Sequence, residues 1–346
     1  MNYPKWSKHT AAISAQENEC SSKGSFFKQV ILISALTLTA FSTVPVHAES
    51  FPSRSLRFIV PFVPGSITDI AARYYAQKLT DLAGQPVVVE NRPGANGVIG
   101  VNAVLNAPAD GYTVLIGTTS TLATNVALYQ SLPYDPLKDL SPISVMVSIP
   151  SIIVAPGDSP YKNLMQLVDA ARVKPDTVNY SAGATSYQLM GELFKEKSGI
   201  TGQAIPYKGA AAALNAVLGK EVDFTIVDVA TALGSVKGKT LKGLAVASER
   251  RLPFLPEVPT ATEAGLPDFI ASTWVAAAVS AKTPTEERTR LEALISKIAT
   301  DPETQSFFSE RGAVMKPAGA DNLRAFQVEE IALWKRIVKL AKIELL

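Results

Sequence analysis

Cysteine and histidine are nearly absent from this chain of 346 residues, which contains one cysteine and two histidines. All three, His9, Cys20 and His47, lie within the first 48 residues. Without that segment the chain has no thiolate nucleophile, no disulfide, no Ser-His-Asp group and none of the common His or Cys metal ligands. An enzyme built on it would have to work with carboxylates, lysine or tyrosine alone.

The first 48 residues have the pattern of a secretion signal. Lys23 and Lys28 precede an apolar run over residues 30–44, and residues 46–48, Val-His-Ala, supply the small side chains that a signal peptidase needs. The run has about 15 residues, which is short of the roughly 20 needed to cross a bilayer. We therefore predict a cleavable signal peptide over residues 1–48 and a mature protein that leaves the cytoplasm.

Net charge is also nearly absent. The predicted leader holds four of the 33 basic residues and two of the 31 acidic residues, which leaves 29 of each in the mature chain. This balance argues against a nucleic-acid or membrane-surface partner, because both favour a basic patch. The remaining 298 residues can bury two modest cores, and the 47% hydrophobic content of the full chain is typical of a globular α/β protein.

Short β-branched segments alternate with helical segments from residue 56 onward, which predicts parallel sheets with helices on both faces. Two apolar segments, Ser141–Ala155 and Trp274–Val279, interrupt the alternation, and we interpret them as crossings between domains. The predicted first domain is discontinuous and comprises residues 49–147 and 273–346. The predicted second domain comprises residues 148–272.

A glycine turn follows the first predicted strand, residues 58–62. Ser66, three residues before Asp69, is a capping pattern for a helix over Ile70–Leu79. Free amides and the positive end of the helix dipole at Gly65 and Ser66 favour an anion at the carboxyl end of a strand, where open α/β sheets bind ligands. Asp69 itself is either a helix cap or a contact to ligand or water.

Two other strand-to-helix junctions carry hydroxyl groups. Thr118–Thr121 follow the third predicted strand, and Ala182–Ser186 open a helix at Tyr187. We expect the turn at Gly183 and the turn at Gly65, one per domain, to face each other across a cleft that closes by hinge motion. Substituting either glycine by Asp is predicted to abolish binding and to leave the fold intact.

No cofactor is expected. Gly94, Gly97 and Gly100 lack the Gly-Lys-Ser/Thr ending of a phosphate loop and the Gly-x-Gly-x-x-Gly spacing of a dinucleotide site. The histidine and cysteine ligands of the common metal sites are missing from the predicted mature chain, so no metal site is expected either.

Several short motifs together resemble one family, the extracytoplasmic receptors of tripartite tricarboxylate transporters, often called the Bug family. The matching segments are Pro61-Phe62 with Gly65 and Thr68-Asp69, residues 90–97, 110–113, 132–136, 206–209, 256–260 and 263–267, and Trp274. The resemblance covers residues 51–340. It implies an α/β, two-domain periplasmic-binding-protein fold of the Venus flytrap, type II-like kind, with two interdomain crossings.

The resemblance also implies a function. Such a receptor captures a small mono-, di- or tricarboxylate in the interdomain cleft, delivers it to the membrane subunits of a tripartite transporter, and acts as a monomer without catalysis. Matching positions imply ligand contacts at Phe62, Gly65, Ser66, Thr68, Asp69, Ser181, Ala182, Gly183, Thr185, Ser186 and Asp228. Thr119 is added because it follows the carboxyl end of a strand.

Three departures from the family pattern concern the same turns. Ser66 stands where the family usually has a second glycine, and Val63-Pro64 replaces the usual Pro-Ala. Between Tyr180 and Leu189 the loop is two residues shorter, and Gln188 takes the place of the usual His. Two alternative functions stay open, the first of them favoured by the shorter loop. One is a periplasmic sensor or scaffold partner with a degenerate site, and the other is an enzyme acting on an organic acid without His or Cys.

Overall fold

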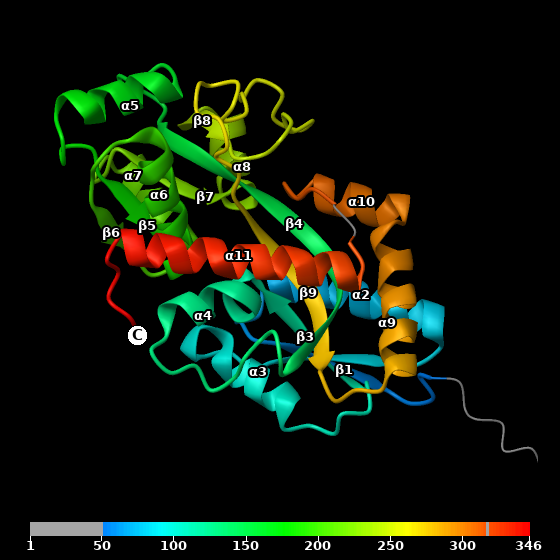
Figure 1. Ribbon diagram of the computed structural model, residues 1–346. Coiled ribbons are helices and arrows are strands. Elements are labelled where there is room, and N and C mark those ends of the chain that lie inside the picture. The colour runs from blue at the N-terminus through cyan, green and yellow to red at the C-terminus, as the bar shows by residue number, and fades with distance from the viewer. Residues whose placement is uncertain (1–50, 316–317) are drawn as a thin grey trace, which may run out of the picture. The chain divides into compact units, whose positions relative to one another are not determined.

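One long strand, β4 (Leu140–Pro156), runs through both halves of the fold (Figure 1). The computed structural model describes residues 51–315 and 318–346, and the predicted signal peptide lies outside them. β4 has 17 residues, no charged side chain and almost no exposed surface, as expected of a strand covered on both faces. Its register shifts beside Pro142, where a bulge accommodates a residue that cannot donate to the ladder.

The first sheet has the strand order β2-β1-β3-β9-β4. The three strands β2, β1 and β3 are parallel, whereas β9 is antiparallel to both of its neighbours. The other strands of this sheet are β1 (Leu56–Val60), β2 (Val87–Asn91), β3 (Thr113–Thr118) and β9 (Ser272–Ser280). The accompanying helices are α2 (Ile67–Ala83), α3 (Val98–Leu105), α4 (Asn125–Leu128), α9 (Thr285–Ala299), α10 (Pro302–Ser309) and α11 (Ala320–Leu340).

The second sheet continues from β4 in the order β4-β7-β5-β6, and β8 also pairs with β4. β5 is parallel to β6 and β7, whereas β4 is antiparallel to β7 and β8. Its strands are β5 (Tyr180–Ala182), β6 (Ala204–Pro206), β7 (Phe224–Asp228) and β8 (Leu241–Val246). Its helices are α5 (Leu164–Val173), α6 (Thr185–Ser198), α7 (Ala210–Leu218) and α8 (Val229–Lys237).

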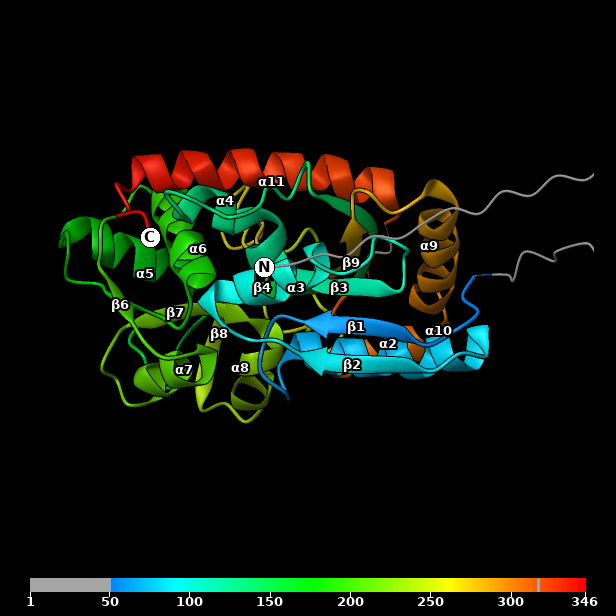
Figure 2. The same cartoon turned by 90° about the horizontal axis from the view of Figure 1, so that it is seen from below.

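The continuous apolar sequence of β1 reflects burial on both of its faces. Phe58 packs in a core with Tyr75 and Leu79 of α2, and Ile59 points to the opposite core, which includes Val101 of α3. Each such side chain contributes about 1.5–3 kcal/mol when fully buried. The strand is thereby held firmly, and its arrowhead points toward the half that contains α7 and α8 (Figure 2).

The last long helix, α11, contacts both halves of the fold (Figures 1 and 2). It packs on β4 and α4 of the first half, and it also contacts α6 of the second half. Arg336 of α11 forms an ion pair with Glu196 of α6. The two halves are therefore joined by a helix in addition to the two strands.

The alternation of strands and helices confirms the predicted α/β class. The two predicted crossings are the strands β4 and β9, which lie side by side in antiparallel order. The proposed borders between residues 147 and 148 and between 272 and 273 fall inside these strands, and the division into domains stays a prediction. Within the described residues no helix is long and apolar enough to span a membrane.

Candidate functional site

A pocket of about 200 Å³ lies where the two sheets meet. Its lining combines the first turns of α2 and α6, the segment after β3, the end of β7, the middle of β4 and the start of β9. The residues are Phe62, Ser66, Ile67, Thr68, Thr118, Thr119, Ser120, Ile149, Ala184, Ser186, Tyr187, Asp228, Thr273, Trp274 and Val275. Both halves of the fold and both crossings therefore contribute to one site.

The first wall of the pocket is the N-terminus of α2. Ser66 is the N-cap, with φ −66° and ψ 158°, and its hydroxyl accepts a hydrogen bond of 3.2 Å from the amide of Asp69. The predicted capping pattern is confirmed, and this backbone conformation does not require the glycine that the family usually has. The amides of Ile67 and Thr68 belong to the first turn, where the helix itself supplies no acceptor. This wall therefore favours a negatively charged ligand group.

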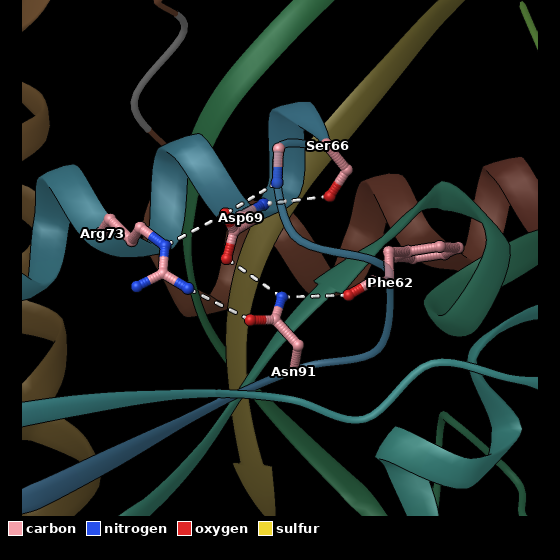
Figure 3. A network of polar contacts seen from close by, with 6 residues as sticks. Phe62, Ser66, Asp69, Arg73 and Asn91 are labelled. Carbon is pink, nitrogen blue, oxygen red and sulfur yellow. Dashed lines mark hydrogen bonds and ion pairs between the residues drawn. The ribbon is translucent and has the colours of Figure 1, made fainter.

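Asp69 holds the turn in place through a network of polar contacts with Ser66, Arg73 and Asn91 (Figure 3). One carboxylate oxygen accepts hydrogen bonds from the amide of Gly65 at 2.9 Å and from Nε of Arg73 at 3.0 Å. The other accepts from the side-chain amide of Asn91 at 3.0 Å, which also donates to the carbonyl of Phe62. Asp69 is 3% exposed and does not line the pocket. Its contacts favour a structural role over ligand binding.

The charge of Asp69 should make this turn sensitive to acid. Burial raises the pKa of the carboxyl, but hydrogen bonds from Arg73, Gly65 and Asn91 outweigh it and hold the pKa below 3.8. A lowered pKa contributes stability that is complete above about pH 4 and is lost as the pH falls through the folded-state value. In urea unfolding at pH 7, Asp69→Ala should lose about 2 kcal/mol, because three donors lose their acceptor.

The stability difference between wild type and Asp69→Ala should shrink below about pH 4. Asp81→Ala, at the exposed far end of the same helix, is the control and should change stability by less than about 0.5 kcal/mol. Equal effects of the two substitutions at pH 7 would show that the Asp69 network does not hold the turn.

Hydroxyl groups after β3 connect the pocket to the strand β9. The hydroxyl of Thr119 accepts a hydrogen bond of 3.1 Å from the amide of Trp274, and the hydroxyl of Thr118 accepts one of 3.2 Å from the amide of Ser120. Trp274 lines the pocket but is only 1% exposed, and its ring packs against Phe326 of α11. Thr119 thus lines the pocket and also stabilises the fold through its hydrogen bond with Trp274.

The second wall is the N-terminus of α6. Its N-cap is Ala184, which offers no side-chain cap, so the first-turn amides at Ser186 and Tyr187 keep their donor capacity. Thr185 and Gln188 line a separate hollow of about 320 Å³ rather than the pocket. Because Ser186 and Ser66 line the same pocket, the two predicted turns lie on one site.

Residues just before α6 have structural contacts instead. The hydroxyl of Ser181 is buried and donates to the carbonyl of Ala213 at 2.7 Å. Gly183 packs so closely on Gly209 that an added Cβ would lie 2.4 Å from the carbonyl group of Gly209. The expectation that Gly183→Asp leaves the fold intact is therefore wrong. At Gly65 there is open space around the site of a Cβ, but its φ of +81° disfavours any side chain.

Asp228 and Tyr187 form a polar pair at the edge of the pocket. Asp228 caps α8 by accepting hydrogen bonds from the amide and hydroxyl of Thr231, at 2.8 and 2.9 Å. The hydroxyl of Tyr187 donates to the second carboxylate oxygen. Burial, together with the neighbouring charge of Asp228, raises the pKa of Tyr187 well above its usual value. Tyr187 therefore remains a protonated donor.

The structure brings together half of the residues predicted from the sequence. Those that line the pocket are Phe62, Ser66, Thr68, Thr119, Ser186 and Asp228, and those that do not are Gly65, Asp69, Ser181, Ala182, Gly183 and Thr185. The sequence interpretation did not include Ile67, Thr118, Ser120, Ile149, Tyr187, Thr273, Trp274 and Val275 among the ligand contacts, whereas Ala184, which also lines the pocket, lies within its predicted second wall, residues 181–186. Ile67 and Tyr187 directly follow the predicted turns in the sequence. This proximity could have indicated them as candidate pocket residues. The role of every one of these residues in ligand binding stays a prediction.

Known proteins with similar sequences and folds point to one family. BugT of Bordetella pertussis is 35% identical over 311 residues, which cover 89% of this chain and 95% of BugT. The R. palustris protein Rpa4515, solved with adipate, has a TM-score of 0.76 and 32% identity, covering 86% of this chain and all of that one. MatC from Rhodopseudomonas palustris, solved with bound malate, has a TM-score of 0.71 and 28% identity, covering 83% of this chain and all of MatC.

The family model described as the tripartite tricarboxylate transporter family receptor, TctC, matches residues 71–343. These residues include most of α2, both crossing strands and the pocket lining from Thr118 onward, whereas the first wall at the N-terminus of α2 lies just before them. The predicted two-domain periplasmic-binding-protein fold is confirmed by the solved structures of this type. The chain belongs to the family of tripartite tricarboxylate transporter receptors, the solute-binding proteins known as TctC or Bug proteins.

Proposed function

We propose that this receptor captures a small carboxylate-bearing organic acid in the pocket and delivers it to a tripartite tricarboxylate-type membrane permease. Receptors of this family are periplasmic solute-binding proteins, and the proposed signal peptide over residues 1–48 would direct the chain to that compartment. The relatives solved with adipate and malate support a carboxylate ligand. The main structural support is that two uncapped or partly capped helix N-termini, those of α2 and α6, line one pocket.

The pocket can hold an anion without a basic side chain. Removing an ionised carboxylate from water has a penalty of several kcal/mol, and a hydrogen bond to a charged group returns about 1.5–3 kcal/mol, so about three donors are required. The first turn of α2 offers the amides of Ile67 and Thr68, and that of α6 offers the amide and hydroxyl of Ser186. The α6 wall also offers the amide of Tyr187, so the two walls together exceed the required number of donors, and a ligand held by both couples binding to their approach.

The proposed closing motion turns the two domains about their connections. The domains are residues 49–147 with 273–346, and residues 148–272. Ile149 of β4 pairs with Thr273 of β9, and both line the pocket. A ligand between the walls therefore rests directly on the strands about which the domains would turn. The contact between α11 and α6 limits the directions in which they can move.

Thermal unfolding tests this function directly. Protein purified from the periplasm of an expression host should be stabilised by one member of a panel of mono-, di- and tricarboxylates, amino acids and aromatic acids. At a ligand concentration about 100 times Kd the stabilisation is about 2.7 kcal/mol. Mass spectrometry should recover the same acid chemically unchanged and in a 1:1 ratio.

Three results would contradict the proposal. Stabilisation by no organic acid would favour a sensor or scaffold protein with a degenerate site. Conversion of the bound acid to another compound would favour an enzyme, and a neutral solute as the only stabilising compound would contradict the helix-terminus argument.

A further inference from the structure

The candidate pocket contains one formal charge, and that charge is negative. Among its described lining residues there is no Lys, Arg or His, and Asp228 is the only carboxylate. Asp228 is 8% exposed and caps α8, whose N-terminal dipole favours a negative charge at this position. An organic acid that enters the pocket therefore meets the carboxylate of Asp228, and no described residue of the lining carries a positive charge.

Asp228 retains acceptor capacity on the pocket side. One oxygen accepts two hydrogen bonds from Thr231, and the other accepts one from the hydroxyl of Tyr187. An ionised carboxylate offers about four acceptor positions, so the oxygen bound to Tyr187 has room for one more donor. Because Tyr187 and Asp228 both line the pocket, a ligand group can supply it.

We propose that the ligand is an amino acid or hydroxy acid that places its carboxylate at the N-termini of α2 and α6 and its ammonium or hydroxyl group at Asp228. This inference rests on the proposed function and narrows its substrate class. Asp228 acts as the specificity-determining residue. Ammonium and hydroxyl groups share the required chemistry, which is a hydrogen bond donated to a carboxylate.

A fully ionised dicarboxylate of the same length fits this arrangement poorly. Its second carboxylate would lie against Asp228, and two neighbouring carboxylates disfavour each other's charged form. It also donates no hydrogen bond, so the remaining acceptor position of Asp228 would lose its water without gaining a partner. The pocket thus selects against such a ligand by a repulsive group as well as by a missing contact.

Matched ligand sets provide the test by isothermal titration calorimetry at pH 7. The first starting set consists of succinate, 4-hydroxybutanoate and 4-aminobutanoate. The second consists of adipate, 6-hydroxyhexanoate and 6-aminohexanoate. Corresponding sets are built on the carbon skeleton of whichever acid stabilises the protein most. Wild-type protein should bind the amino or hydroxy member at least about tenfold more tightly than the dicarboxylate.

Asp228→Asn removes the charge and keeps an oxygen that can cap α8. This variant should lose or reverse the preference. The ratio of the affinity for the amino or hydroxy acid to the affinity for the dicarboxylate should change at least about tenfold. Asp223→Asn is the matched control, because it makes the same change of net charge next to the same strand, where its carboxylate accepts from the amide of Asn179 outside the pocket. It should leave the ratio unchanged.

Tyr187→Phe separates charge from hydrogen bonding. It removes one donor from Asp228 and leaves the negative charge in place, so the preference for the amino acid should be retained. Preference of wild type for the dicarboxylate, or an equal ratio in Asp228→Asn and Asp223→Asn, would overturn this inference and leave the proposed function standing. Failure of every organic acid to bind wild type would overturn both.

Discussion

Gly183→Ala should unfold at a much lower urea concentration than wild type, with a loss of about 2–4 kcal/mol. The added Cβ would lie 2.4 Å from the carbonyl carbon and oxygen of Gly209 and 2.6 Å from the amide nitrogen of Ala210. These are backbone atoms, so relief requires the two chain segments to separate. Separation also breaks the 2.9 Å hydrogen bond from the amide of Gly209 to the carbonyl of Gly183.

Gly234→Ala is the matched control for this substitution. Gly234 lies in α8 of the same half of the fold, is exposed, and has no atom within 4 Å of an added Cβ. Because alanine is the better helix former, this variant should gain up to about 1 kcal/mol. If both variants lost stability equally, the close packing of Gly183 on Gly209 would not be the reason for glycine at position 183.

Ser186→Trp should abolish ligand binding while leaving the protein folded. Ser186 is half-buried in the first turn of α6 and lines the pocket, and no hydrogen bond of its hydroxyl is recorded among the described residues. An indole group at this position would occupy most of a pocket of about 200 Å³ and would keep the two walls apart. Affinity for the acid that stabilises wild type should fall at least about 100-fold, measured by calorimetry.

Lys197→Trp places the same side chain on the same helix, far from the pocket. Lys197 is exposed near the end of α6, and its replacement should leave affinity within about twofold of wild type. Both variants should show wild-type circular dichroism. Retained affinity in Ser186→Trp would mean that the ligand binds outside this pocket, and the hollow beside Thr185 and Gln188 would then be the next candidate.

Local sequence patterns predicted much of the architecture because they depend on neighbours along the chain. The hydroxyl of Ser66 and the amide of Asp69 lie three residues apart, and one helical turn brings them together wherever the helix lies. The helix predicted over Ile70–Leu79 lies within α2, which extends from Ile67 to Ala83. The uncharged composition of β4 and β9 likewise reflects burial on both faces.

The role of Asp69 shows where local patterns stop being informative. A carboxylate in the first turn of a helix suits both capping and ligand binding, so the sequence left both interpretations open. Asn91, which lies 22 residues further along the chain at the end of β2, donates to Asp69 only because β1 and β2 pair in parallel register. That register turns the carboxylate toward the sheet and away from the pocket.

The sequence by itself determined the α/β alternation, the two crossing strands and the helix N-termini that favour an anion, since each depends on residues within one or two turns of chain. Only the tertiary structure decided which side chains share the pocket. Ile149 and Thr273 meet by strand pairing, and Tyr187 meets Asp228 across the second sheet, 41 residues apart. Such contacts depend on sheet register and packing, which no local spacing encodes.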